Sequence, residues 1–336
     1  MKRGKSIAAI GIASLGMLLM ILDSKTFLNG AMDGVQLCIR TVLPSLFPFI
    51  VLSGFMIHHL DDIALPYLNF PARLCRLPQG AESIWILGFL GGYPVGAKAV
   101  AQLYRKGALD RLNAQRMLGF CSNCGPSFMF GMVACLFDKP VVTWLLWLIH
   151  MVSAILVGIS LPYSDHHALV KKQLSEDTFF DPVGNASNVM INICGWIILA
   201  RSLGAFLDRW FLWLLPQNLR AILMGMLELA NGCVELQNTA SEPFRFVAVS
   251  GLLAFGGLCV LMQTRSVTGS LGLGQYLTGK LLQTLYSLSF AAGLHPILFP
   301  GAGHWTVCTI LLIPGFCVIF AYRKKDVAFC PKPLYN

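Results

Sequence analysis

The chain has 336 residues, of which 56% are hydrophobic and 12% charged, and its formal net charge is +9. A soluble domain usually carries about 25% charged residues, so this composition excludes an ordinary soluble domain. The positive charge does not indicate nucleic-acid binding, because the basic residues cluster in short loops between apolar stretches, as the positive-inside rule expects. The composition therefore predicts an all-α polytopic membrane protein whose surroundings are the lipid bilayer.

The start of the chain, residues 1–33, is predicted to hold one transmembrane helix over 6–22. Basic residues precede this apolar run, which also resembles the beginning of a signal peptide. No small-x-small cleavage site lies before Asp23, which favours a retained helix, with cleavage as the open alternative.

Two consecutive repeats are predicted after this helix, residues 34–160 and 188–321. Each repeat contains helices of about the length that crosses a ~30 Å hydrocarbon core. The predicted spanning helices lie at 34–58, 140–161, 188–214, 275–294 and 303–321. With the first helix and the two interrupted helices described below, they give about eight crossings.

Each repeat also contains a shorter apolar stretch, at 83–104 and at 218–240, that is predicted to be a re-entrant hairpin. In the first stretch, Gly92, Pro94 and Gly96 lie among further glycines. A glycine destabilises a helix interior by about 1 kcal/mol and a proline by about 3 kcal/mol. This composition favours a turn over a straight spanning helix.

An interrupted helix follows each hairpin, at 112–137 and at 244–264. Gly125-Pro126 breaks the first helix and Gly256-Gly257 the second. The backbone groups freed by such a break must find partners in the protein or in a water-filled cavity. Breaks at corresponding positions of two halves are typical of a transporter substrate site.

The basic residues set the predicted topology. With both termini in the cytoplasm, most of the 25 lysines and arginines fall on the cytoplasmic side, including those of a loop at 161–187 and a tail at 322–336. The two hairpins then enter the membrane from opposite sides. The segment order therefore predicts an inverted repeat.

Several motifs resemble the YlbJ family of sporulation integral membrane proteins, which carry paired nucleoside-recognition (gate) domains. The stretches Pro44–Phe49, Gly92–Lys98 and Phe120–Pro126 resemble its first half, and Gly225–Gly232 and Gly256–Gln263 its second. The resemblance covers nearly the whole chain. It implies a fold like that of concentrative nucleoside transporters.

The same resemblance implies a transporter that carries a small anion, dipicolinic acid, from the mother cell towards the forespore across the outer forespore membrane of an endospore former. The alternatives are a nucleoside or nucleobase transporter and a non-transporting assembly factor of a sporulation membrane complex. Ser122 and Cys124 depart from the family pattern, which usually has an asparagine and a small residue there.

The residues predicted to bind the solute are Lys98, Ser122, Asn123, Gly125, Glu228, Asn231 and Gln263. An ammonium within the membrane is expensive, so Lys98 is predicted to pair with a solute carboxylate, with snorkelling to the interface as the alternative. The half-helix beginning near Pro126 is predicted to offer free N–H groups to an anion. Glu228 either couples an ion or pairs with Lys98.

A second set of residues is predicted to shape the turns and breaks: Gly92, Tyr93, Pro94, Gly96, Pro126, Gly232, Gly256 and Gly257. The sequence contains no P-loop, HExxH motif or other catalytic signature. The protein is therefore not expected to be an enzyme, and no metal site and no cofactor are expected. The coupling ion, Na⁺ or H⁺, and the formation of a homo-oligomer stay open.

Overall fold

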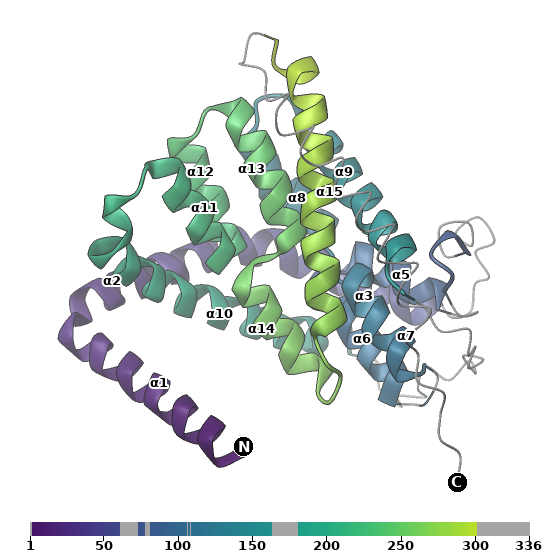
Figure 1. Ribbon diagram of the computed structural model, residues 1–336, viewed down its shortest axis with the longest axis horizontal. Helices are drawn as coiled ribbons and strands as arrows, with labels where there is room; N and C mark the ends of the chain where they lie inside the picture. The colour runs from purple at the N-terminus through teal and green to yellow at the C-terminus, as the bar shows by residue number, and fades with distance from the viewer. Residues whose placement is uncertain are drawn as a thin grey trace.

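The computed structural model describes residues 2–60, 73–77, 81–105, 107, 109–162 and 181–300. These residues form helices joined by short turns (Figure 1). The helix predicted at 303–321, the tail at 322–336 and most of the loop predicted at 161–187 lie outside the described residues. The α-helices are α1 (Lys2–Leu22), α2 (Ser24–Leu37), α3 (Leu43–Leu60), α5 (Glu82–Leu90), α6 (Val95–Arg105), α7 (Arg111–Cys121), α8 (Pro126–Gly131), α9 (Pro140–Ser160), α10 (Pro182–Trp210), α11 (Gln217–Leu227), α12 (Leu229–Thr239), α13 (Glu242–Phe255), α14 (Gly257–Thr268) and α15 (Gly274–Leu298).

Four stretches of the described helices are long and apolar enough to cross a membrane: Ser24–Leu52, Pro140–Ser160, Pro182–Trp210 and Glu242–Thr268. Many of their large apolar side chains face outward, as they would towards lipid. Sequence and helices therefore agree on a helical multi-pass membrane protein.

The first long helix begins earlier than predicted. The sequence placed its start at 34, but α2 begins at Ser24 and continues through a π-helical segment, Cys38–Val42, into α3. The reason is close packing between helices. A Cβ built on Gly30 would lie 2.8 Å from the Ala205 Cβ. Because glycine has no side chain, α2 can pack closely against α10 at this position.

The helices α2 and α10 lie side by side and run antiparallel (Figure 1). Trp210 Nε1 donates to the Asp23 carboxylate at 2.8 Å at one end of the contact. Further along, the Cys38 thiol points to the Cys194 carbonyl at 3.9 Å. The helix that opens the first predicted repeat thus packs on the helix that opens the second.

Two pairs of short helices occupy the segments predicted as hairpins. In the first helix pair, α5 and α6 are joined by residues 91–94; in the second, α11 and α12 meet at Glu228. With nine to eleven residues each, these helices are shorter than a ~30 Å hydrocarbon core requires.

A pair of glycines allows the two helices of each pair to approach. A Cβ built on Gly96 would lie 2.8 Å from the Gly88 Cα, and one on Gly232 would lie 2.1 Å from the Gly225 Cα. Both distances are too short for a side chain. The two helix pairs therefore use glycine for the same purpose, as predicted for Gly96 and Gly232.

The two interrupted helices are broken where the sequence predicts. The first runs as α7 and α8 with extended residues 122–125 between them. The second runs as α13 and α14, and its break has positive φ angles of 82° at Gly256 and 85° at Gly257. Glycine is the residue that adopts this backbone region readily, which explains the break.

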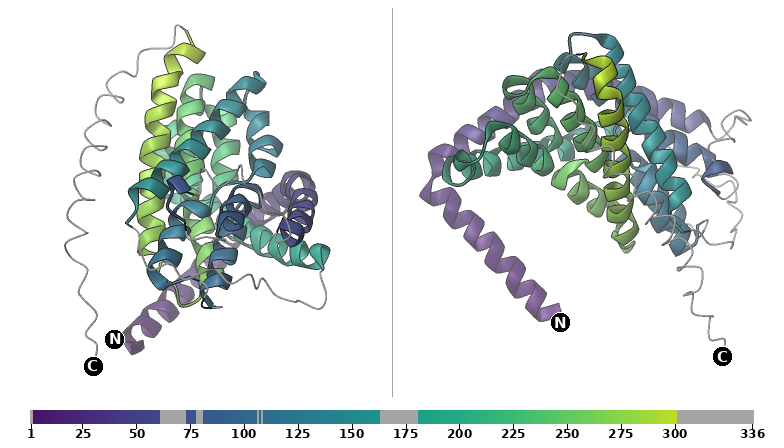
Figure 2. Two further views of the ribbon diagram at one scale, coloured as in Figure 1. Left: turned by 90° about the vertical axis from the view of Figure 1, so that its right-hand side faces the viewer. Right: turned by 45° about the horizontal axis from the view of Figure 1, so that its top comes forward.

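Helix α15 packs against α7, α9 and α13 and so lies beside the helices that carry both breaks (Figure 1). Hydroxyls join these helices: Ser153 and Ser287 lie 2.9 Å apart, and Ser250 donates to the Ser287 carbonyl at 3.2 Å. In contrast, α1 stands apart from this bundle and meets it next to α2 (Figure 2).

Arg116, counted with the cytoplasmic loops in the topology, is a buried residue of α7. Its guanidinium donates to the carbonyls of Cys75, Gly158 and Leu161. Gly158 and Leu161 lie at the end of α9, and Cys75 lies in the segment before α5. The arginine is retained inside the protein because it donates hydrogen bonds to carbonyl groups that have no N–H partner within a helix.

Candidate solute site

A pocket lies where the turns of both helix pairs meet both interrupted helices. The first turn contributes Gly91, Gly92 and Tyr93, and the second turn contributes Glu228, Leu229 and Ala230. The rest of the wall comes from the break before α8, from α8 and α14, from the π-helical segment and from α3 and α10; these residues are Val42, Leu46, Ile50, Cys124, Gly125, Ser127, Phe128, Ile193, Ile197, Val260 and Gln263.

Each turn is pressed against a break. A Cβ on Gly125 would lie 2.9 Å from the Gly92 Cα, so the first turn touches the break between α7 and α8. A Cβ on Gly257 would lie 3.1 Å from the Gly225 carbonyl oxygen, so the second break touches the second helix pair. The pocket is thus framed twice by the same combination of elements.

Tyr93 connects the two halves at the pocket wall. Its hydroxyl donates to the Leu253 carbonyl of α13 at 3.1 Å and lies 3.3 Å from the Lys280 Nζ of α15. Tyr93 precedes Pro94 in a cis peptide bond. The residue predicted to shape the turn therefore also holds it to the second half.

A buried polar network supports the break between α7 and α8. Asn123 donates to the Phe120 carbonyl at 2.6 Å and accepts from the Gln283 Nε2 at 3.0 Å. The Cys124 N–H donates to the His150 Nε2 at 3.1 Å. The backbone groups that the interruption frees therefore find side chains of α9 and α15, as a break in lipid requires.

Lys280 lies at the centre of this network. Its Nζ donates to the Ser122 carbonyl and, at 2.9 Å, to the Gln283 Oε1. The side chain is 1% exposed, and none of the ion pairs among the described residues includes it. Removing an ammonium from water costs several kcal/mol, so its retention calls for a specific role.

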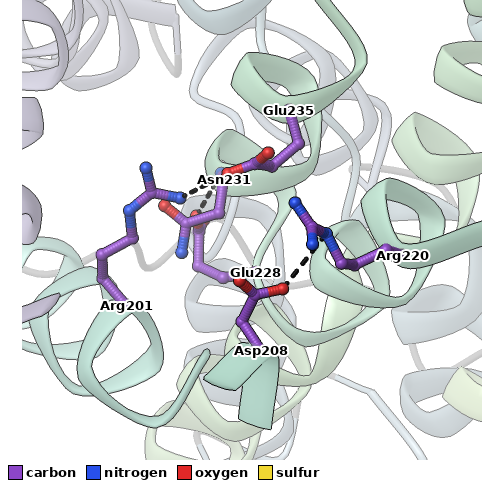
Figure 3. A network of polar contacts seen from close by, with 6 residues as sticks. All are labelled: Arg201, Asp208, Arg220, Glu228, Asn231 and Glu235. Carbon is purple, nitrogen blue, oxygen red and sulfur yellow. Dashed lines mark hydrogen bonds and ion pairs between the residues drawn. The ribbon is translucent and has the colours of Figure 1, made fainter. Parts of the chain in front are cut away.

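Glu228 forms the N-cap of α12 on the opposite wall. Its two carboxylate oxygens accept from the N–H groups of Ala230 at 3.1 Å and Asn231 at 2.8 Å. Figure 3 shows Glu228 beside Asn231. The carboxylate is 6% exposed and faces the positive end of the α12 dipole. The N-terminus of this helix is thus already occupied by an anion of the chain itself.

Two ion pairs hold the second helix pair to α10. The Arg201 guanidinium lies 3.4 Å from the Glu235 carboxylate, and that of Arg220 lies 3.1 Å from Asp208 (Figure 3). Arg201 therefore anchors α12.

The structure brings five predicted residues to the pocket: Gly92, Tyr93, Gly125, Glu228 and Gln263. Ser122 and Asn123 are fully buried behind its wall. Pro126 is the first residue of α8, as predicted for a shaping proline. This helix has six residues and ends at Gly131, and a 3₁₀ segment, Val133–Leu136, follows it in place of the helix predicted to continue to 137.

Two predicted ligands lie elsewhere. Asn231 is fully buried beside Glu228 but does not line the pocket, and among the described residues its carboxamide has no hydrogen-bond partner. Lys98 is half-buried on α6 and also lies outside the lining. The buried amine next to the first turn is that of Lys280 instead.

The sequence analysis therefore missed Lys280, Gln283 and His150. The signal for Lys280 was the one used for Lys98, a lysine within an apolar stretch. What distinguished the two was tertiary packing.

Among the described residues, no group of three or more His, Cys, Asp and Glu side chains could hold a metal ion.

Comparison with known proteins gives one curated relative. Over 306 residues the chain is 25% identical to the sporulation integral membrane protein YlbJ of Bacillus subtilis (strain 168), covering 76% of this chain and 74% of that protein. The resemblance to the YlbJ family predicted from the motifs is confirmed. No family model and no solved structure matches the chain.

Proposed function

We propose that this relative of the YlbJ membrane proteins transports a small aromatic anion, with dipicolinic acid as the expected cargo. The similarity to a sporulation integral membrane protein supports a membrane location during sporulation. The expected site of action is the outer forespore membrane, with both chain termini in the cytoplasm of the mother cell.

The observation that carries this proposal is the pocket lined by both turns and both interrupted helices. Solute sites in secondary transporters lie at the interface of two repeats, beside discontinuous helices. We therefore infer that the two helix pairs are re-entrant hairpins and that the two halves form an inverted repeat with about eight crossings.

The aromatic and aliphatic residues of the wall suit a flat ring. Tyr93 and Phe128 offer aromatic faces, and the aliphatic side chains of α3 and α10 complete an apolar enclosure. The buried ammonium of Lys280 lies 5.0 Å from the centre of the Tyr93 ring and adds positive charge behind the wall. Gln263 also lines the pocket and provides an amide for a carboxylate oxygen.

The proposed transport is tested in proteoliposomes that contain trapped Tb³⁺, whose luminescence rises when dipicolinate enters. The wild type should produce a dipicolinate-dependent signal that empty vesicles lack. Ile197→Trp, which fills the pocket from α10, should reduce the initial rate at least about tenfold. Leu199→Trp serves as the matched control, since Leu199 lies on the same helix and is 48% exposed.

The absence of any dipicolinate signal from folded wild-type protein would overturn the proposed cargo. The second candidate is a nucleoside or nucleobase, which the aromatic wall would also accept. Efflux of preloaded radiolabelled uracil or uridine distinguishes the two, since dipicolinate transport predicts no exchange with either compound. A protein that moves neither class of solute would instead favour the assembly-factor interpretation.

A further inference from the structure

We propose that the Lys280 ammonium acts as a built-in cation that fills the position of a coupling alkali ion, so that transport by this chain does not use Na⁺ at the first break. The inference deepens the proposed transport function and rests on it for its physiological meaning. Whether the site at the first break holds the Lys280 ammonium in place of Na⁺ can be tested without any solute.

The partners of Lys280 are the oxygens expected around a bound cation. They are the Ser122 carbonyl at the end of α7, the Gln283 Oε1 at 2.9 Å and the Tyr93 hydroxyl at 3.3 Å. The three oxygens come from the break, from α15 and from the first turn. The ammonium therefore ties together the elements that frame the pocket in the first half.

The position itself attracts positive charge. The carbonyl groups at the interrupted end of a helix carry the negative end of its dipole. In transporters with discontinuous helices, unwound carbonyls and half-helix C-termini coordinate the coupling ion. The Ser122 carbonyl follows the last residue of α7, Cys121, and so belongs to this class of ligand.

The charge count of the site leaves no place for a second cation. An ammonium has three donors, and the structure gives Lys280 three oxygen acceptors. The rings of Tyr93 and Tyr276, with centres 5.0 and 5.8 Å from the Nζ, cover it further. A sodium ion beside this amine would meet an equal charge in a site shielded from water.

The alternative role, direct binding of an anionic solute, fits the geometry less well. Lys280 does not line the pocket, whereas Tyr93, whose hydroxyl contacts the amine, does. All three donors are engaged within the protein. The amine therefore supports the break, and it acts on the solute only through its electrostatic field.

The test compares thermal unfolding of the purified full chain in detergent, in sodium chloride and in choline chloride of equal ionic strength. The wild type should unfold at the same temperature in both salts. Lys280→Ala should unfold at a lower temperature in choline and recover by a few degrees with increasing Na⁺, because Na⁺ now binds the emptied site. Lys98→Ala, a lysine variant outside the network, should show no difference between the salts.

Two results would overturn the inference: a Na⁺-dependent rise for the wild type that Lys280→Ala abolishes, or a folded Lys280→Ala that ignores Na⁺, K⁺ and Li⁺ alike. If Lys280→Ala does not fold, Lys280→Gln is measured in its place and judged by the same criteria. Dipicolinate uptake by the wild type should also be equal in the two salts. Failure of uptake with the expected unfolding pattern would remove the cargo and leave the cation assignment intact.

Discussion

Gly225 and Gly232 face each other across the second helix pair, so closely that a Cβ on Gly232 would lie 2.1 Å from the Gly225 Cα and 2.7 Å from its nitrogen. Both obstructing atoms belong to the backbone, so no rotamer change can relieve the contact. The turn at Glu228 depends on this approach, because it brings α12 back along α11.

Gly232→Ala should therefore lower the unfolding temperature, with a cost of about 1–3 kcal/mol for forcing the two helices apart. Gly195→Ala is the matched control, since a Cβ there meets no atom within 4 Å. The control should be neutral or stabilising, because alanine favours a helix over glycine by about 1 kcal/mol. Equal unfolding temperatures for both variants would contradict the packing argument.

Asn123→Ala should destabilise the break between α7 and α8. The substitution removes the partner of the Phe120 carbonyl and leaves the buried Gln283 amide without Asn123. Each buried polar group left unsatisfied costs about 1–3 kcal/mol. Thermal unfolding should show the loss, and the double variant Asn123→Ala with Gln283→Leu should recover part of it. Strict additivity of the two substitutions would argue against a shared network.

Tyr93→Phe should uncouple the first turn from the second half with little change in shape. The variant loses the bond to Leu253 and one acceptor of Lys280, about 0.5–1.5 kcal/mol for a typical hydrogen bond. Because the ring stays in the pocket wall, solute affinity should change less than the uptake rate. Initial-rate measurements over a range of dipicolinate concentrations separate the two quantities, and a pure affinity effect would refute this role.

Glu228→Ala should weaken the start of α12 by about 0.5–2 kcal/mol, the cost of removing an N-cap. Glu228→Asp serves as the conservative comparison, since it keeps a carboxylate and a good capping residue. If Glu228 acts as a cap, stability should follow the order wild type, Asp variant, Ala variant. An alanine variant as stable as the wild type would show that the two N–H bonds contribute nothing.

The ion pair between Arg201 and Glu235 should contribute little despite its position beside the site. Both side chains are partly exposed, and such pairs typically give 0–1 kcal/mol. A double-mutant cycle with Arg201→Ala and Glu235→Ala in unfolding experiments should return a coupling energy below about 1 kcal/mol. A larger coupling would mean that the pair is shielded from water in the membrane-embedded protein.

The sequence predicted the segment order well because glycine and proline leave a local signature. The breaks at Gly125-Pro126 and Gly256-Gly257 and the turn near Pro94 depend on the backbone preferences of those residues, which neighbouring helices hardly change. Helix length was less predictable. The start of α2 at Ser24 is set by its contact with α10, which no window of local sequence contains.

The choice between Lys98 and Lys280 shows the same limit at the site. Both lysines interrupt apolar stretches, and the sequence favoured Lys98 because it follows the glycine-rich turn. The structure leaves Lys98 half-buried and places Lys280 against the first break, where α15 crosses α7. Which amine is enclosed depends on this helix crossing and therefore on tertiary structure.

The two turns of the pocket differ in charge. The second turn carries the Glu228 carboxylate on the wall, and the first lies against the Lys280 ammonium through Tyr93. An electric field therefore runs across the cavity from the first turn to the second. A solute with its negative groups at one end would be aligned before any side chain contacts it, so the pocket selects an orientation as well as a size.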